Sequence, residues 1–404
     1  MNRVRRSLTV FAFLILAFPL CAERVRVVVA YHDAEEGHGK RWGDAPVFSF
    51  DVERAELDAL RHDPRVLAVT VDEGGQGGLL ESIPVVGADA LRAQGIDGRG
   101  RTIAVLDTGI DTDHPDFAGR IVEEQCFCDN VDGSGCCPGG LLRRSGPGAA
   151  EDDNGHGTHV TGIAAGGGAV AAPGVAPAAK IVAVKVMDAQ NRFRTFTQIY
   201  DALAWIADHR PDVDAINMSL GSFARYEPQN CGGAAVALGL QPVIARLRQR
   251  GVLIAACSGN DGDTKGLWLP ACMDEVLAVG ATFDVPGPRG TPDAVVGFTN
   301  STMSLDILAP GADIVSSARG GGKVSLSGTS MATPHVAGTI LLIRQVSGPH
   351  LSADFLQELL RRTGKPVLDT RNGLTFPRLD ALAAVSAAPR PPGVPRRRAS
   401  RQTH

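Results

Sequence analysis

The fold is decided by residues 325–338, which read Ser325-Leu326-Ser327-Gly328-Thr329-Ser330-Met331-Ala332-Thr333-Pro334-His335-Val336-Ala337-Gly338. An apolar segment, residues 339–343, follows directly. A short β-like run at 324–326 meets Gly328, after which small residues open a helix. Ser330 is therefore expected at a helix N-terminus, where unpaired N–H groups and the positive end of the helix dipole favour developing negative charge. Pro334 fits such a helix, because in a first turn its missing N–H loses no internal partner.

Two interpretations of Ser330 are open at this point. Most serines at a helix start are N-caps. A serine on a sharp strand-to-helix turn is also the nucleophile of known serine enzymes. The second interpretation requires a base, a group that orients the base, and an oxyanion donor elsewhere in the chain.

Length and composition describe an ordinary globular protein. The chain has 404 residues, enough for two or three folded units, with 44% hydrophobic and 21% charged residues. The formal net charge is −4, and no basic domain stands out apart from a short tail. We therefore expect no nucleic-acid partner.

The first residues, 1–22, have the pattern of a secretory signal peptide. Arginines near the start precede the apolar run 8–20, which is too short to span a bilayer comfortably. We therefore expect a secreted protein, extracellular or periplasmic, without a permanent membrane span. Cys21 leaves a lipoprotein alternative open, in which this cysteine would be acylated. Residues 18–20 are Phe, Pro and Leu, whereas lipoprotein processing favours small residues before the cysteine.

Export makes disulfides permissible for the eight cysteines. If Cys21 leaves with the signal, an odd number remains, which predicts a free thiol. Four cysteines crowd one Gly- and Asp-rich stretch and are expected to form two local bridges of open connectivity, or alternatively a zinc site: Cys126, Cys128, Cys136 and Cys137. Cys231 and Cys272 are expected to pair with each other, which leaves Cys257 as a buried lone thiol.

Residues 23–78 have the pattern of a small α+β unit. The expected strands are 24–31, 46–50 and 66–71, and the expected helix is 53–62. A glycine-rich joint at 74–78 follows. A small unit joined in this way to a large one suggests a pro-segment.

Residues 79–387 alternate apolar runs with helical patterns. The expected buried strands are 102–106, 180–186, 215–218, 252–256 and 276–280, and the expected helices are 156–165, 197–209, 234–250, 330–345 and 353–363. This alternation predicts an α/β fold, a mainly parallel sheet with helices on both faces. Residues 388–404, rich in Pro and Arg, are expected to be a disordered tail.

Polar residues with catalytic potential follow the expected strands, where sites gather in such folds. Asp107 ends the strand 102–106, and Asn260 ends the apolar run from Val252 with a side-chain amide suited to an oxyanion. His156 begins a helix between two glycines, and the positive dipole end is expected to keep its pKa from rising. As alternatives, Asp107 would be a loop cap and Asn260 an ordinary turn residue.

A metal site is a further alternative. His156 and His159 lie three residues apart, with Asp152 and Asp153 nearby, and such a set can ligate zinc. The spacing differs from His-Glu-x-x-His, and no acidic residue stands between the histidines. His159 is instead expected to be a hydrogen-bonded core residue.

Three blocks together resemble the signature motifs of the subtilisin-like serine proteases, the subtilases: residues 107–111 (Asp-Thr-Gly-Ile-Asp), 156–160 (His-Gly-Thr-His-Val) and 328–335 (Gly-Thr-Ser-Met-Ala-Thr-Pro-His). The order Asp, His, Ser is also that of the family. The resemblance covers residues 83–385 and implies the subtilisin-like three-layer fold, preceded by an inhibitory propeptide at 23–78.

The resemblance also implies roles. Ser330 would attack the scissile carbonyl, His156 would transfer the proton, Asp107 would hold the imidazole, and Asn260 would stabilise the oxyanion. Ser219, Leu220 and Gly221 would pair with the substrate backbone, and Cys257, Ser258 and Gly259 would form the opposite wall of the S1 pocket. Residues 265–270 would border that pocket, and whether the Trp268 indole fills it or faces away is left open.

Two departures from the family stand out. Asp116 matches a calcium-ligating Asp, but the loop 166–172 has no carboxylate or amide side chain, so structural calcium is left open. A cysteine-rich insertion at 124–150 is expected to stiffen an exposed loop near the cleft.

The sequence therefore predicts a secreted serine endopeptidase, made as a self-processed zymogen and requiring no cofactor for its chemistry. Its expected partners are protein or peptide substrates and its own propeptide, and it is expected to be a monomer. The alternatives are a non-catalytic binding module on the same scaffold and a metal-dependent hydrolase.

Overall fold

The computed structural model describes residues 24–33, 35, 37–41, 47–71, 79–130, 132–284, 291–348 and 351–390. It forms two compact units that divide the chain between Gln76 and Gly77. The predicted signal peptide, the glycine-rich joint and all but the first residues of the predicted tail lie outside the described residues. Within the described part of the chain, no helix is both long and apolar enough to cross a membrane.

The first unit is a small antiparallel sheet with one short helix. The strands are β1 (Arg24–Tyr31), β2 (Lys40–Arg41), β3 (Val47–Glu53) and β4 (Val66–Val71), in the order β2-β3-β1-β4. The helix α1 (Leu57–Arg61) is shorter than predicted, because Glu53 belongs to β3, where it pairs with Arg24 of β1, and residues 54–56 form a 3-10 helix. Val27, Val29 and Leu57 are among the residues of its core.

The helices of the second unit are α2 (Leu79–Val86), α3 (Ala88–Arg92), α4 (His156–Ala165), α5 (Phe196–His209), α6 (Pro228–Cys231), α7 (Ala235–Gln249), α8 (Thr329–Ser347), α9 (Ala353–Thr363) and α10 (Ala381–Ala387). Its strands are β5 (Thr102–Asp107), β6 (Ile121–Phe127), β7 (Arg143–Ser145), β8 (Lys180–Lys185), β9 (Ala215–Met218), β10 (Arg225–Tyr226), β11 (Leu253–Cys257), β12 (Leu267–Trp268), β13 (Leu277–Thr282), β14 (Ile307–Pro310), β15 (Ile314–Ala318), β16 (Gly322–Leu326), β17 (Lys365–Asp369) and β18 (Leu374–Arg378).

The main sheet has the order β17-β18-β14-β13-β11-β9-β5-β8-β6-β7. Its interior pairs, such as β5 with β8 and β9, are parallel, and only the edge strands β17 and β7 pair antiparallel. The predicted mainly parallel sheet is therefore confirmed. The sequence did not predict β6, β7, β14, β17 and β18, several of which are partly exposed and charged edge strands rather than apolar runs.

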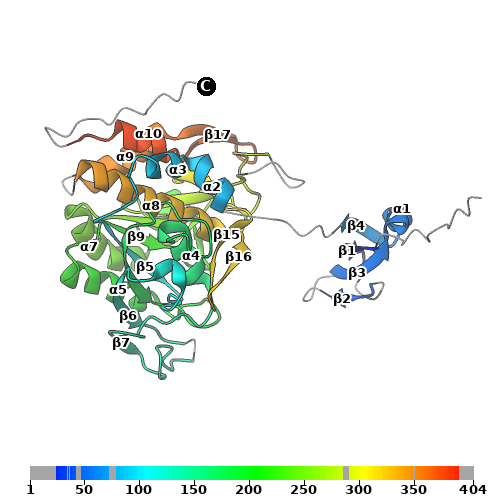
Figure 1. Ribbon diagram of the computed structural model, residues 1–404, viewed down its shortest axis with the longest axis horizontal. Coiled ribbons are helices and arrows are strands. Elements are labelled where there is room, and N and C mark those ends of the chain that lie inside the picture. The colour runs from blue at the N-terminus through cyan, green and yellow to red at the C-terminus, as the bar shows by residue number, and fades with distance from the viewer. Residues whose placement is uncertain are drawn as a thin grey trace, which may run out of the picture. The chain divides into compact units, whose positions relative to one another are not determined.

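Two helical layers cover the sheet, as alternate residues of β5 illustrate. Ile103 and Val105 pack in one core with residues of α4 and α8, whereas Ala104 and Leu106 pack in the other with residues of α5 and α7. Figure 1 shows α5 and α7 side by side, at the flank of the sheet away from α8. The predicted three-layer α/β fold is confirmed, and the carboxyl ends of β5, β9 and β11 meet at one edge of it.

Candidate active site

Asp107 is the last residue of β5 and is fully buried. Its Oδ1 accepts a hydrogen bond from the Thr108 backbone N–H at 2.8 Å and another from His156 Nδ1 at 2.7 Å. Its Oδ2 is buried and has no hydrogen-bond partner among the described residues. The pair fixes the imidazole with Nδ1 protonated, which leaves Nε2 as the basic nitrogen.

His156 begins α4, after Gly155 at the N-cap with a left-handed φ of 111° that favours glycine. Burial disfavours the charged imidazolium, but the charge and hydrogen bond of Asp107, with a contribution from Asp152, outweigh burial and raise the pKa of His156 above 6.5. The sequence-based expectation that the helix dipole keeps this pKa from rising is wrong, because the directly bonded Asp107 carboxylate has the larger effect on the imidazole.

Asp152 positions the turn that presents His156, a role that the sequence did not suggest. Its carboxylate accepts hydrogen bonds from the N–H groups of Asn154 and Gly155 and from the Thr158 hydroxyl at 2.6 Å. It also accepts one from the Thr108 hydroxyl at 2.8 Å, which joins the end of β5 to the start of α4. Burial alone would raise the pKa of Asp152, but these donors lower it.

Ser330 is the second residue of α8, and Gly328 is the N-cap, so the N-cap interpretation of Ser330 does not hold. Its side chain is nearly buried, with the residue 7% exposed. Ser330 Oγ donates to the Ser219 carbonyl oxygen at 3.2 Å, and Ser219 Oγ donates back to the Ser330 carbonyl oxygen at 2.7 Å. The start of α8 is thereby joined to the end of β9.

Asn260 is oriented by Thr329. Its Oδ1 accepts hydrogen bonds from the Thr329 N–H and hydroxyl, both at 2.9 Å, so its Nδ2 is turned away from Thr329. A Cβ atom built on Gly328 would lie 3.6 Å from Asn260 Nδ2 and 3.7 Å from Ser330 N. The two N–H donors therefore flank the same small space, and such a pair suits an oxyanion.

Cys257 ends β11 beside these groups and is a free, fully buried thiol. Burial raises its pKa to about 12. The thiol therefore stays protonated and inert, as predicted. Ser258 and Leu220 are also buried, in the two segments that continue β11 and β9.

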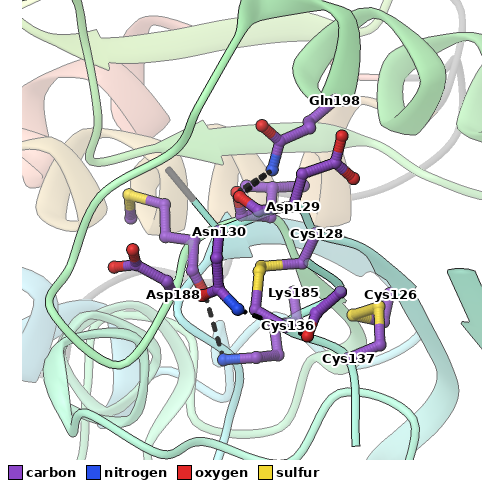
Figure 2. Close-up of a disulfide and its surroundings, with 12 residues drawn as sticks. Cys126, Cys128, Asp129, Asn130, Cys136, Cys137, Lys185, Asp188 and Gln198 are labelled. Atoms are coloured by element: carbon purple, nitrogen blue, oxygen red, sulfur yellow. Dashed lines mark hydrogen bonds between the residues drawn. A yellow bond between two sulfur atoms is a disulfide. The ribbon is translucent and has the colours of Figure 1, made fainter. Parts of the chain in front are cut away.

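The other described cysteines form disulfides. Cys126 pairs with Cys137, Cys128 with Cys136, and Cys231 with Cys272. The zinc alternative for the first four is wrong, because their sulfur atoms are bonded to one another. Figure 2 shows the first two bridges together, with Gln198 of α5 donating to the Asp129 carbonyl oxygen beside them at 3.4 Å. The insertion is thus braced internally and anchored on α5.

The alternative metal site at the two histidines is not formed. His159 is buried, and its Nε2 lies 3.0 Å from the carbonyl oxygens of both Ile314 and Val324, so it is the core residue predicted. Burial lowers its pKa to about 4. In the described parts of the chain, no group of three or more His, Cys, Asp and Glu side chains is placed to hold a metal ion.

Asp116 is buried and faces hydrogen-bond donors. Its Oδ1 accepts from the N–H groups of Ala169 and Val170 at 2.6 and 2.8 Å, and its Oδ2 from Ala171 N–H at 3.1 Å and the Ser317 hydroxyl at 2.7 Å. Burial alone would raise the pKa of Asp116, but these donors lower it below 3.8. Calcium requires oxygen ligands, so a carboxylate surrounded by N–H groups does not fit it.

Arg120 supplies a positive charge next to Asp116. Its guanidinium donates to the main-chain carbonyl oxygens of Asp116, Ala165 and Ala179. Burial lowers the pKa of Arg120, and the Asp116 charge raises it. These carbonyl oxygens are thus directed at a side-chain cation of the protein itself.

An Asp–His pair at the carboxyl end of a parallel strand, a serine at a helix start and two convergent N–H donors are the groups that a serine hydrolase site requires. The chain belongs to the subtilase family, peptidase S8, whose model matches residues 98–380. It is a subtilisin-like serine endopeptidase.

Its relatives include named proteases. The chain is 35% identical over 277 residues to the intracellular serine protease of Paenibacillus polymyxa, covering 66% of this chain and 74% of that protein. It is 37% identical over 261 residues to subtilisin BL of Lederbergia lenta, covering 64% and 82%. The crystal structure of a cold adapted subtilisin-like serine proteinase matches with a TM-score of 0.55 and 30% identity, over 70% of this chain and 90% of that one.

Proposed function

We propose that this protease is secreted as a zymogen and hydrolyses proteins through an acyl-enzyme, with Asp107, His156 and Ser330 as its triad. The observation that carries the proposal is the 2.7 Å hydrogen bond between Asp107 and His156 Nδ1. That bond leaves Nε2 free to act as a base at the edge of the sheet where Ser330 begins α8.

The chemistry follows from these positions. Ser330 Oγ attacks the scissile carbonyl carbon while its proton passes to His156 Nε2. Asn260 Nδ2 and Ser330 N–H stabilise the oxyanion, and Asp107 stabilises the imidazolium. The carbon–nitrogen bond then breaks, and His156 returns the proton to the leaving amine. Water, deprotonated by the same Nε2, hydrolyses the acyl-enzyme and restores Ser330.

Extended peptides are the substrates that this site suits. Residues 219–221 leave β9 beside Ser330, and we assign them the role of an edge that pairs with the substrate main chain. Residues 257–259 would form the facing wall of the S1 pocket.

Secretion and zymogen processing are supported by separate features. The charge and length of residues 1–22 suit a signal peptide. Disulfides such as Cys231–Cys272 suit an oxidising compartment. The described residues 24–71 form a small α+β fold in a compact unit of their own, which suits a removable pro-segment. We propose that cleavage near Leu79 releases it and that the mature enzyme is a monomer that binds no nucleic acid.

We also propose that the chemistry requires no metal, since the triad supplies nucleophile, base and electrostatic stabilisation. The donors around Asp116 further support a catalytic domain that does not take up calcium at this residue.

The test is Ser330→Ala in the full-length chain. We expect loss of casein hydrolysis, loss of labelling by a fluorophosphonate, and retention of residues 23–78 on the secreted product. Ser304→Ala, which removes another serine hydroxyl from the same domain, is the control and should process normally. Normal self-processing of Ser330→Ala would refute the mechanism, and wild-type protein that stays inside the cell would refute secretion alone.

A further inference from the structure

Trp268 lies across the two segments that lead away from Ser330. Its backbone N–H donates to the Ser258 carbonyl oxygen at 3.0 Å, and the neighbouring Leu269 carbonyl oxygen accepts from Ser222 N–H at 2.9 Å. Residues 268–269 therefore bridge the continuation of β11 on one side and that of β9 on the other.

The indole lies directly against both segments. A Cβ atom built on Gly221 would lie 2.9 Å from Trp268 Cβ and 3.1 Å from Trp268 Cε3, and one built on Gly259 would lie 2.9 Å from both Cδ1 and Cδ2 of the same indole. Such distances are closer than carbon atoms pack, so a side chain at Gly221 or Gly259 would collide with the indole, and one at Gly259 would also collide with Asn300 Nδ2. The space between the segments is consequently occupied by Trp268 itself.

Polar contacts fix the ring in this orientation. Trp268 Nε1 donates to Asp261 Oδ2 at 2.7 Å, and Asn300 Nδ2 donates to the same oxygen at 3.0 Å. Arg225, which pairs with Trp268 between β10 and β12, forms an ion pair with Asp261 Oδ1 at 3.7 Å. Rotating the indole away would break its hydrogen bond to Asp261, so these contacts hold the ring in place between the two segments.

The disulfide Cys231–Cys272 braces the same region. Cys272 N–H donates to the Trp268 carbonyl oxygen at 2.9 Å, and Cys231 belongs to α6, which follows β10 in the chain. The segments before and after the indole are thereby tied together.

A substrate must place its scissile carbonyl between Ser330 Oγ and the donors of Asn260 and Ser330. Ser219 O lies 3.2 Å from Ser330 Oγ on one side, and Asn260 follows Gly259 directly on the other. The side chain of the residue that contributes the carbonyl, P1, therefore enters between the two segments, where the indole lies.

We propose that Trp268 restricts P1 to small side chains, namely Gly, Ala and Ser. The inference rests on the proposed catalytic role of Ser330 and adds the side-chain preference. A P1 Phe or Leu would need the volume that the indole fills, and overfilling a packed site is strongly unfavourable. Steric discrimination in a hydrophobic pocket changes kcat/KM by tenfold or more.

The experiment compares succinyl-Ala-Ala-Pro-X-p-nitroanilides with X as Ala, Leu or Phe. For the wild type we expect kcat/KM at least about tenfold higher for Ala than for Phe. The ratio of kcat/KM for the Phe substrate to kcat/KM for the Ala substrate should rise in Trp268→Val and rise further in Trp268→Ala. In the Trp268→Ala variant we expect this ratio to increase by about tenfold or more. Trp268→Phe keeps an aromatic ring and should keep the small preference. Trp205→Ala, which removes an indole from α5, is the control and should leave the ratio unchanged.

Active-site titration with a fluorophosphonate corrects every rate for folded enzyme, so a poorly folding variant does not distort the ratio. Wild-type enzyme that cleaves after Phe as well as after Ala, or variants with an unchanged ratio, would overturn the assignment of Trp268 and leave the proposed catalysis intact. Wild-type enzyme that neither cleaves any peptide nor reacts with the fluorophosphonate would instead overturn the proposed function, and this inference with it.

Discussion

Asp107 and Asp116 are two buried carboxylates on the same stretch of chain, and they differ in how fully their oxygens are hydrogen-bonded. Asp107 binds Thr108 and His156 through Oδ1 and leaves Oδ2 buried without a hydrogen-bond partner in the described structure. Asp116 uses both oxygens to accept from three backbone N–H groups and from Ser317. One carboxylate is under-satisfied, and the other is saturated.

The difference follows from what each charge has to do. Neutral hydrogen-bond donors around a carboxylate stabilise its negative charge and leave fewer lone pairs to bind a further partner. In the proposed mechanism, Asp107 keeps part of its charge available to the imidazolium that forms on His156, at the expense of local stability. Asp116 accepts hydrogen bonds from the N–H groups of residues 169–171 and from Ser317 of β15. Its charge therefore stabilises the fold of this loop.

The largest effect on activity is expected for Asp107→Asn, which removes the charge that distinguishes Asp107 from Asp116 in its effect on His156. The variant keeps the shape of the side chain but removes the charge and allows the wrong imidazole tautomer, so we expect kcat to fall about 10⁴-fold. The melting temperature should change little, since an amide oxygen can still accept from Thr108. Steady-state kinetics and differential scanning calorimetry measure the two quantities. Activity retained within tenfold would show that Asp107 does not act on His156.

A smaller effect, on stability instead of rate, is expected for Asp116→Ala. Removal of the carboxylate leaves several N–H groups without their acceptor, so we expect the free energy of unfolding to fall by about 3 kcal/mol. The kcat of the folded enzyme should be unchanged. Urea unfolding followed by fluorescence measures the loss, with Asp113→Ala, at an exposed neighbouring position, as the control.

Chelation separates this account of Asp116 from a calcium site. If the N–H donors stabilise Asp116, EDTA should leave the wild-type unfolding midpoint unchanged. A midpoint that falls with EDTA and returns with calcium, and that responds in the wild type but not in Asp116→Ala, would establish a calcium ion at Asp116 and refute our interpretation.

The sequence was sufficient for the parts of the site that lie on regular elements. Asp107 follows a short apolar run, and His156 and Ser330 stand at the starts of expected helices. Each position alone left alternatives open, and the three blocks together indicated the site. The helices at 156–165 and 353–363 were predicted to the residue. Their convergence could be expected because the carboxyl ends of parallel strands share one edge of a sheet.

Other features depend on contacts between distant segments, which no local pattern records. The orientation of Trp268 depends on its pairing with Arg225 and on Asp261, and the bonding of Asp116 depends on the path of the loop at 169–171. The direction of the His156 pKa shift was predicted wrongly for the same reason, since it depends on a 2.7 Å contact with Asp107. The connectivity of the first four cysteines likewise required coordinates.

The smallest effect sharpens the comparison through pH. Because His156 must be neutral to accept a proton and Asp107 raises its pKa above 6.5, the acid limb of kcat/KM in the wild type should lie above pH 6.5. Removing an opposite charge so close to a histidine lowers its pKa, so Asp107→Asn should move the limb to lower pH. Asp116→Asn should not move it, because the charges that raise the His156 pKa are those of Asp107 and Asp152. The rate of fluorophosphonate labelling as a function of pH measures all three enzymes, including the slow one. An equal displacement in both variants would mean that the saturated carboxylate also acts on the imidazole, and the distinction between the two residues would fail.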